Sequence, residues 1–342
     1  MRELAAELLA GEDAWVVGGA VRDELLGRDV VDLDIVCRDP QTAARSYANR
    51  SGGAPFPLSE RHGAWRVALD GDRTVDFTPL RGGIEEDLAW RDFTINAIAV
   101  PLAGGEPIDP YSGRTDLEAK VVRAVSPTVF TDDPLRLLRA VRIADELGFS
   151  LDPETEQLVR EHAELVTRPA GERTYAELMS LSEAGYRRAG ELGLLEPLGG
   201  SIDGLERAQS VDSARIRLVA VFGESLGRLP VPGELHRYAG ALLHAEAPED
   251  DSPRAIHRFR RATEPWALDA LAFVGASALA GAVEKARASE PAEPLLRGDE
   301  LGLPPGPEIG RLLEVVEEER AAGTIATREE ALELVQRELK GG

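Results

Sequence analysis

Two aspartates one residue apart, Asp32 and Asp34, form the pair in this chain whose type and spacing most directly suggest chemistry. They alternate with apolar residues in the segment 31–36, whose composition predicts a strand. Because the side chains of a strand alternate between its two faces, we expect both carboxylates on one face. Neighbouring carboxylates with no basic residue on that face are suited to Mg²⁺, which prefers oxygen ligands. The segment therefore predicts a divalent-cation site, against the alternative of a surface strand with chance acidic residues.

A phosphate-binding turn is expected immediately before this strand. The apolar residues 16–17 end a short strand, and Gly18 and Gly19 then let the backbone approach a phosphate closely. A helix expected over about 20–26 points its first N–H groups toward that phosphate. Arg22 lies one turn into this helix, where its guanidinium can hold a phosphate oxygen bidentately. Together these residues indicate a site for a nucleoside triphosphate.

A third carboxylate and an Arg-Asp pair follow. Asp76 lies in a second strand-like run, 74–77, and a two-metal nucleotidyl-transfer site uses three carboxylates. Asp76 is therefore the candidate third ligand, against the alternative of an aspartate on an exposed edge strand. Further on, Arg91 is suited to a phosphate and Asp92 to a sugar hydroxyl, although such neighbours are usually surface ion pairs.

An arginine stripe is expected on a later helix. Asp133 and Pro134 are typical of a helix start, as cap and first helical residue. Arg136, Arg139 and Arg142 then recur at three-residue intervals, which predicts a slanted stripe facing water or an anionic ligand. An aspartate beside an arginine can read the edge of a base by accepting and donating hydrogen bonds. The alternative is a solvated helix face on which Asp133 is only a cap.

Composition limits the remaining possibilities. A chain of 342 residues with 43% hydrophobic residues can bury a sizeable core and divides into two or more domains. The net charge of −22 argues against general affinity for nucleic acid but not against a local basic patch. The single cysteine, Cys37, excludes an internal disulfide and fits a reducing cytoplasm. With no apolar run near 18 residues and no signal-peptide pattern, we expect a cytoplasmic protein with no membrane partner.

The sequence pattern changes once along the chain, from strand-like to helical. Short strand-like runs at 65–69, 74–77, 95–100 and 121–125 alternate with turns up to about residue 125. From about residue 131 the pattern is helical and rich in Ala, Leu, Glu and Arg. The sequence thus predicts an α+β fold, with a small mixed α/β head followed by an all-α remainder.

Five blocks in this order resemble the class II tRNA nucleotidyltransferases, the CCA-adding enzymes and bacterial poly(A) polymerases of the polymerase-β-like superfamily. They are GGAVRD at 18–23 with DLD at 32–34, RDFTINA at 91–97, DPYSGRTDL at 109–117 with Arg123, DDPLRLLRAVR at 132–142, and GERTYAEL at 171–178. The resemblance covers about the first 180 residues.

The resemblance implies a catalytic nucleotidyltransferase head over 1–125, a helical neck for nucleotide selection over 126–190, and a helical body and tail that bind tRNA over 191–342. It implies two Mg²⁺ ions held by the catalytic carboxylates Asp32, Asp34 and Asp76. Asp133 and Arg136 match the amino-acid template that selects CTP and ATP in the family. The full expected nucleotide-binding set is Gly18, Gly19, Arg22, Arg91, Asp92, Asn96, Asp133, Arg136, Arg139 and Arg142.

Two departures from the family pattern bear on the product. Trp90 stands where the family has the first of two arginines. The segment from Asp76 to Asp92 is also compact, which in the family is associated with enzymes that add only the two Cs to the tRNA 3′ end. We therefore expect CC addition, with a separate enzyme adding the final A. The alternatives are a full CCA-adding enzyme or poly(A) polymerase, a transferase acting on a small molecule or protein, and a non-catalytic RNA-binding relative.

Overall fold

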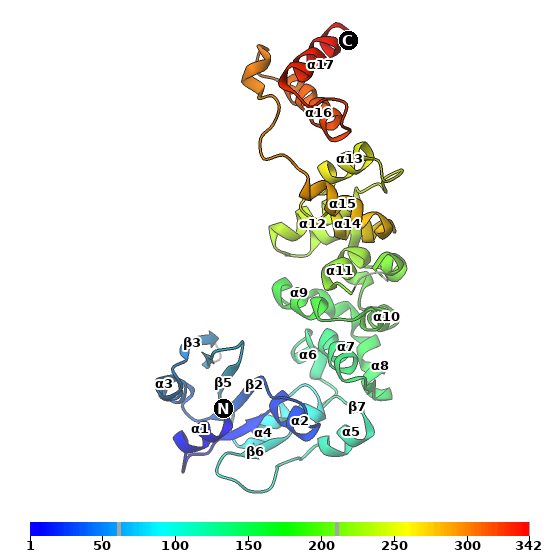
Figure 1. The fold of residues 1–342 in the computed structure, drawn as a ribbon. Coiled ribbons are helices and arrows are strands. Elements are labelled where there is room, and N and C mark those ends of the chain that lie inside the picture. Colours follow the sequence, from blue (N-terminus) through cyan, green and yellow to red (C-terminus); the bar gives the residue numbers. More distant parts are fainter. Residues whose placement is uncertain (60–62, 209–211, 342) are drawn as a thin grey trace. The chain divides into compact units, whose positions relative to one another are not determined.

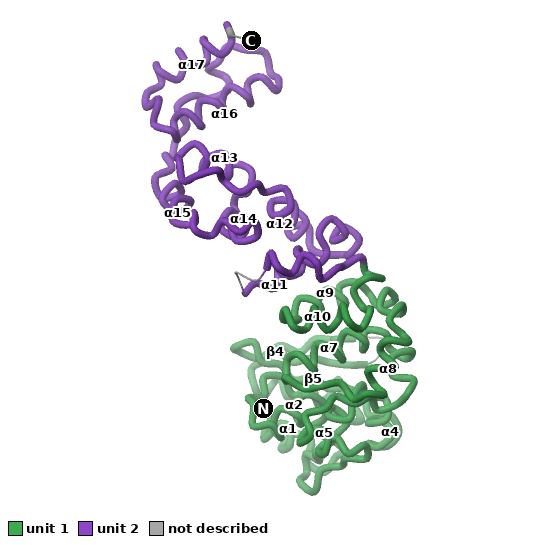
Figure 2. The backbone as a smooth tube through the Cα atoms, turned by 90° about the vertical axis from the view of Figure 1, so that its right-hand side faces the viewer, with its two compact units in different colours: residues 1–198 green, residues 199–342 purple. Residues whose placement is uncertain are grey.

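The computed structural model describes residues 1–59, 63–208 and 212–341. The chain forms two compact units, residues 1–198 and 199–342, drawn in different colours in Figure 2. The first unit holds every residue of the expected nucleotide site, so the expected head and neck lie in one compact body. The division into head, neck, and body with tail remains a proposal.

A six-stranded sheet of order β3-β4-β5-β2-β1-β6 organises the first unit (Figure 1). Its strands are β1 Trp15–Val17, β2 Asp32–Cys37, β3 Ala54–Ser59, β4 Ala64–Ala68, β5 Thr74–Pro79 and β6 Ala99–Pro101. β2 and β5 pair in parallel, whereas the other neighbours pair antiparallel. The strands expected near residues 16–17, 31–36, 65–69 and 74–77 are confirmed to within about three residues at each end.

The two faces of this sheet are used differently. On one face, helix α3 (Pro40–Ser51) packs against β4 and β5, and the ring of its Tyr47 lies 5.8 Å from that of Phe77. Helix α1 (Arg2–Leu8) packs against α3. The opposite face carries Asp34, which is directly across from Asp76 in the strand register. This face therefore carries both carboxylates and a buried apolar cluster. The part that the cluster leaves uncovered is where a polar site can form.

That apolar cluster closes part of the second face. It contains the buried residues Val17, Val36, Leu88, Ala97 and Ala99. Leu88 comes from the short helix α4 (Ile84–Ala89), which follows β5 after four connecting residues. The cluster therefore ties the segment after β5 to the sheet.

The strand expected over 95–100 is only partly correct. The chain forms a 3₁₀ turn, Thr94–Asn96, before β6 begins at Ala99. The Thr94 hydroxyl donates to Asp116 at 2.7 Å. The side-chain amide of Asn96 accepts a hydrogen bond from Arg22 and donates one to Asp92. These contacts link the turn to α2 (Gly19–Leu25), to α5 (Gly113–Ala119) and to Asp92. The run at 121–125 likewise yields only β7, Val121–Val122, paired with β8, Ser150–Leu151.

The helix that carries the arginines begins later than expected. After α5 (Gly113–Ala119) and α6 (Val129–Asp132), helix α7 spans Arg136–Leu147. Its approach is a tight turn, because the amide N–H of Arg136 donates to the Asp133 carbonyl at 3.0 Å. The Asp133 carboxylate accepts from the amide of Leu135 at 3.2 Å, so it caps this turn. The unit continues with α8 Pro153–Glu161, α9 Gly171–Met179 and α10 Glu183–Glu191.

The described part of the second unit is built from helices. They are α11 Ala214–Phe222, α12 Gly233–Leu243, α13 Pro253–Thr263, α14 Ala267–Phe273, α15 Ala280–Ala288, α16 Pro307–Ala321 and α17 Arg328–Gly341, with short 3₁₀ turns between several of them. A separate apolar core that includes Leu312, Val316, Ala331 and Val335 joins α16 to α17. The expected α+β head with a helical remainder is confirmed.

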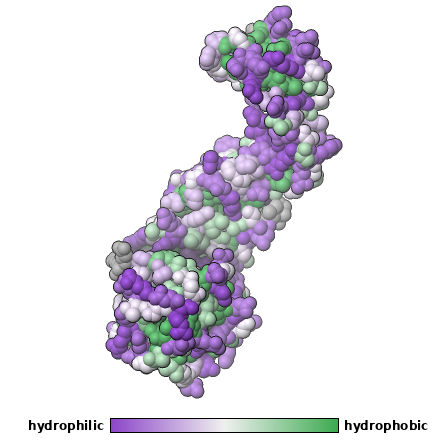
Figure 3. All heavy atoms as spheres, turned by 60° about the vertical axis from the view of Figure 1, so that its left-hand side comes forward, coloured by the Kyte–Doolittle hydropathy of each residue, from purple (hydrophilic) through white to green (hydrophobic). Residues whose placement is uncertain are grey.

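Polar side chains cover much of the face drawn in Figure 3, with apolar patches between them. Among the described residues, no helix combines the length and apolar character needed to cross a membrane.

Candidate nucleotidyl-transfer site

The carboxylates of β2 are crowded by other carboxylates. Asp34 is half-buried, and Asp32 accepts a hydrogen bond from the Thr74 hydroxyl at 2.8 Å. Burial raises the pKa of Asp34; nearby Arg91 opposes this, and the negative charges of Asp76 and Asp32 add to the rise. A group in such surroundings is stabilised by any cation that approaches it. The expectation that Asp32 and Asp34 share a face with a third carboxylate is confirmed by the strand register.

The third carboxylate already has a cation beside it. Arg66 of β4 lies across from Asp76 and holds both of its oxygens, from Nε to Oδ1 and from Nη2 to Oδ2, each at 2.7 Å. These hydrogen bonds raise the pKa of the Arg66 guanidinium. The expectation that this face has no basic residue is therefore wrong, because β4 brings Arg66 to it. As arranged here, no three His, Cys, Asp or Glu side chains within residues 1–59, 63–208 and 212–341 form a ready metal cluster.

Gly18 lets a carboxylate and a guanidinium come close together. It has φ of 73°, in the left-handed region that favours glycine. A Cβ at this position would lie 2.9 Å from Oδ2 of Asp34 and 3.1 Å from Nη1 of Arg91. Any larger residue would push these groups apart, so glycine is needed here for a steric reason as well. Gly19 begins helix α2, Gly19–Leu25, one residue before the helix expected over about 20–26.

A buried hydrogen-bonded chain connects α2 to α7. Arg22 donates from Nη1 to Asn96 at 3.0 Å, and the Asn96 amide donates to Oδ1 of Asp92 at 3.0 Å. Oδ1 also accepts from the Phe93 amide at 2.8 Å, while Oδ2 accepts from Arg139 at 2.7 Å and 3.0 Å. Burial alone would raise the pKa of Asp92, but the Arg139 charge and these hydrogen bonds lower it well below its usual range. Both oxygens of Asp92 thus accept hydrogen bonds from other residues of the protein, and one of them positions Arg139.

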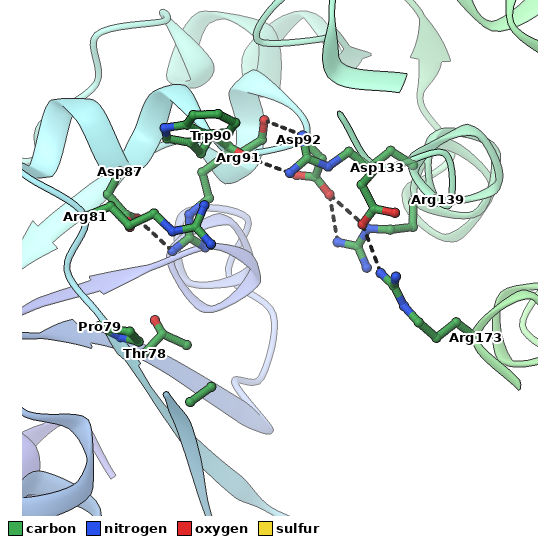
Figure 4. Close-up of a pocket in the computed structure, with 12 residues that line it drawn as sticks. Thr78, Pro79, Arg81, Asp87, Trp90, Arg91, Asp92, Asp133, Arg139 and Arg173 are labelled. Atoms are coloured by element: carbon green, nitrogen blue, oxygen red, sulfur yellow. Dashed lines mark hydrogen bonds and ion pairs between the residues drawn. The ribbon is translucent and has the colours of Figure 1, made fainter. Parts of the chain in front are cut away.

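An open pocket of about 370 Å³ lies next to this chain (Figure 4). Its lining residues are Ala64, Thr78, Pro79, Arg81, Asp87, Trp90, Arg91, Asp92, Asp133, Arg136, Arg139 and Arg173. Five of the expected nucleotide-binding residues are among them: Arg91, Asp92, Asp133, Arg136 and Arg139. The other expected site residues lie outside this lining: Gly18, Gly19, Arg22, Asn96, Arg142 and the carboxylates Asp32, Asp34 and Asp76.

The residues expected to select the base are held from several directions. Asp133 accepts from Arg173 of α9 at 2.9 Å. Arg136 donates to the backbone carbonyl of Trp90 at 2.6 Å and to that of Arg91 at 3.4 Å. Burial lowers the pKa of Arg136. Because its contacts are with neutral carbonyls, its positive charge is not cancelled by a carboxylate.

The arginine stripe does not act as one surface. Arg142 donates to Glu177 at 2.5 Å and to Glu146 at 2.9 Å, and it does not line the pocket. At about 100° per residue, Arg142 is rotated by about 120° from Arg136 around the helix, whereas Arg139 is rotated by only about 60°. The expected stripe facing water or an anionic ligand is therefore interrupted at Arg142, which joins α7 to α9 through Glu177; its role in nucleotide binding stays a prediction.

Several pocket residues were not expected from the sequence. Arg173, which lines the pocket and contacts Asp133, and Glu177, which lies outside the lining and contacts Arg142, both come from the block at 171–178, one turn apart on α9. Their position in a block shared with the family was the signal that could have identified them. For Trp90 the sequence shows only a difference from the family pattern, and no sequence pattern points to Arg81.

Residues 14–83 and 74–123 match the poly(A) polymerase head domain family. The A-adding tRNA nucleotidyltransferase of Deinococcus radiodurans is 33% identical to this chain, over 95% of each protein. The CC-adding tRNA nucleotidyltransferase of Thermus thermophilus is 31% identical, over 94% of this chain and 92% of that protein. The CC-adding tRNA nucleotidyltransferase of Geobacter sulfurreducens is 46% identical, but only over 50% of this chain and 40% of that protein.

Solved structures share the fold. The Thermotoga maritima CCA-adding enzyme complexed with tRNA has a TM-score of 0.71 and 23% identity, with 99% of this chain and 94% of that chain covered. A CCA-adding enzyme with ATP has a TM-score of 0.78 and 22% identity over the same shares.

Proposed function

The chain belongs to the tRNA nucleotidyltransferase family and is a nucleotidyltransferase, and from this premise we propose that it adds CMP to the 3′ end of tRNA to form the CC of the CCA end. The substrates are CTP and a tRNA that ends at the base preceding CCA. We place the enzyme in the cytoplasm, in keeping with its single, buried and unpaired Cys37.

The observation that carries CC addition is the short, tethered connection between the carboxylate strand and the pocket. Only four residues separate β5 from α4. Leu88 of α4 is fully buried, and the carbonyl of Trp90 just after it holds Arg136 at 2.6 Å. A pocket that accepts first C and then A must change shape, and such changes usually come from a mobile segment. This connection leaves little chain to move, which supports a pocket fixed for one base.

The carboxylates fit divalent cations by their chemistry. We propose that Asp32, Asp34 and Asp76 hold two Mg²⁺ ions, since all three offer the oxygen ligands that this ion prefers. Burial, followed by the negative charges of Asp76 and Asp32, raises the pKa of Asp34, so a cation beside it would stabilise its charged form. Arg66 now balances Asp76, which indicates how strongly this face attracts a cation. When bound, the ions make the primer hydroxyl more acidic and neutralise the pyrophosphate that leaves.

The protein's own residues mainly position the substrates. Gly18 keeps the space beside Asp34 open, and Arg91 at this point is suited to a triphosphate oxygen. Asp133 and Arg136 offer an acceptor and a donor for the edge of the base. Asp92 holds Arg139 in place by a direct hydrogen bond of 2.7 Å. Catalysis then depends on orientation and charge stabilisation, since the transferred group needs no covalent intermediate.

A second candidate is addition of the terminal A. It is favoured by the 33% identity to the Deinococcus radiodurans A-adding enzyme over 95% of both chains. One experiment separates the two. Purified enzyme is given labelled CTP or ATP with three tRNA transcripts, ending before CCA, after C and after CC.

We expect CMP incorporation on the first two transcripts and little AMP incorporation on the third. AMP addition to the CC end at a rate comparable to CMP addition would overturn CC specificity. If CMP were added as well, that result would identify a full CCA-adding enzyme. AMP addition alone would identify an A-adding enzyme, and long A tails on unrelated RNA a poly(A) polymerase.

A further inference from the structure

Trp90 is an exposed aromatic residue at a pocket that otherwise consists mainly of charged groups. Its relative exposure is 52%, and its backbone carbonyl accepts a hydrogen bond from Arg136 at 2.6 Å. The guanidinium of Arg81 lies over the indole, 5.9 Å from the ring centroid. An exposed indole costs hydration free energy, so a surface tryptophan at a functional pocket indicates a ligand that covers it.

The charges of the pocket single out Arg81. Five arginines and three aspartates line the pocket. The aspartates are all paired, Asp87 with Arg91, Asp92 with Arg139, and Asp133 with Arg173. Arg136 donates to backbone carbonyls. Within the described residues, Arg81 has only the indole of Trp90 as a partner, so its charge is available to an anion.

These two residues occupy one side of the pocket. In Figure 4, Trp90 and Arg81 lie on one side, and Asp133, Arg139 and Arg173 lie on the other. The second side contains the residues proposed to read the incoming base, and the triphosphate is proposed to lie near Arg91. Arg91 lies beside Trp90 and Arg81 in Figure 4, but the indole and the Arg81 guanidinium are themselves assigned neither to the base nor to the triphosphate, so they are available to the second substrate, the RNA.

We propose that Trp90 and Arg81 form a subsite for the single-stranded 3′ end of the RNA primer. The indole stacks on a base of the primer, and the guanidinium contacts a phosphate beside it. Unpaired bases at an RNA end are typically recognised by stacking on aromatic side chains and arginine. The inference rests on the proposed function, and it gives a chain with a net charge of −22 a local, cationic and aromatic contact for RNA.

Steady-state kinetics with the transcript that ends before CCA test this assignment. Trp90→Ala should raise the KM for RNA about five- to hundred-fold, the range expected for one lost base stack, and leave the KM for CTP within about twofold. Trp90→Phe should recover most of the RNA affinity. Arg81→Gln should reduce the slope of log Kd for RNA against log salt concentration by about 0.7, the value for one phosphate contact on a single strand.

A second Arg-Trp pair in the same unit supplies matched controls. Arg45 of α3 lies over Trp65 of β4 at 5.2 Å, on the face of the sheet away from the carboxylates. Trp65→Phe and Arg45→Gln should leave the KM for RNA and the salt slope unchanged. RNA should quench the tryptophan fluorescence of the wild-type protein and of Trp65→Phe, whereas Trp90→Phe should lose this quenching.

The outcomes separate this inference from the proposed function. Wild-type CMP incorporation tests the function, while RNA quenching and binding are measured without nucleotide. A raised KM for CTP with an unchanged KM for RNA in Trp90→Ala would assign the indole to the incoming base and overturn the proposal. No change in either KM would also overturn the proposal. The pair would then be only a structural contact between the residues on either side of α4.

Discussion

Asp34 and Asp92 are two acidic residues of the same unit that the fold treats in opposite ways. Asp34 lies among carboxylates, and burial raises its pKa. Asp92 is more deeply buried, yet its pKa falls because the charge and hydrogen bonds of Arg139, together with hydrogen bonds from Asn96 and Phe93, stabilise its charged form. Burial by itself therefore does not decide the state of a carboxylate; its partners do. Asp34 is left in need of a cation, whereas Asp92 is already satisfied and holds other groups in position.

The largest expected effect is on chemistry at Asp34. Asp34→Ala should reduce CMP incorporation by about 10³-fold or more, since the carboxylate serves charge stabilisation in the reaction. Binding of tRNA should stay near the wild-type value, measured by fluorescence anisotropy. Asp70→Ala removes an exposed aspartate from the turn between β4 and β5 and serves as the control. A variant of Asp34 that keeps more than about a tenth of the wild-type turnover would show that the two-metal assignment is wrong.

Substitution of Asp92 is expected to lower the stability of the fold. Asp92→Asn keeps the size of the side chain but leaves Arg139 without its main counter-charge, and breaking such a pair is expected to cost about 3 kcal/mol in the free energy of unfolding. Urea unfolding measures this loss. The exposed pair Arg38–Asp13 provides the contrast, because Asp13→Asn should cost less than about 1 kcal/mol. Equal losses in the two variants would contradict the role given to Asp92.

Asp133 lies between these two cases, as a half-buried carboxylate with one arginine partner. Asp133→Ala should reduce the preference for CTP over UTP about ten- to hundred-fold, the effect of losing one charge-assisted hydrogen bond of about 1.5–3 kcal/mol. Competition between the two nucleotides on one primer measures it. A variant that is slower but equally selective would mean that Asp133 only caps the turn before α7.

The smallest expected effect is on the pH dependence of stability. Because the pKa of Asp34 is raised in the folded protein, folding is penalised as the pH rises from the usual carboxyl range through that raised value. Asp34→Asn removes the penalty, so the variant should be more stable than the wild type at neutral pH. The difference should vanish at pH values below the usual carboxyl range. A difference that does not change with pH would argue against a raised pKa at Asp34.

Addition of Mg²⁺ tests whether Asp34 binds the ion. At ten times its dissociation constant, the ion should add about 1.4 kcal/mol to the wild-type free energy of unfolding, equivalent to a Tm shift of about 2 °C for a chain of this length. Chelation with EDTA should reverse the shift, and Asp34→Asn should lack it.

The sequence alone determined the features that depend on local periodicity. Alternation along 31–36 placed Asp32 and Asp34 on one face, because side chains of a strand repeat every two residues. The strand-like composition of 74–77 correctly indicated the strand that carries Asp76. The five family blocks identified the family, since each block is a short run of chain, and the helical pattern from about residue 131 predicted the helical remainder.

Only the tertiary structure decided which partner each charged group has. Arg66 reaches Asp76 across a strand pair, and Arg139 reaches Asp92 over 47 positions of chain. The spacing of Arg142 predicts a side chain that faces water or an anionic ligand, but α9 brings Glu177 to it. A charge pattern shows that a residue needs a partner, whereas packing selects that partner from distant segments. The physical reason is that electrostatic pairing depends on distance in space and on burial, and neither is contained in the local order of residues.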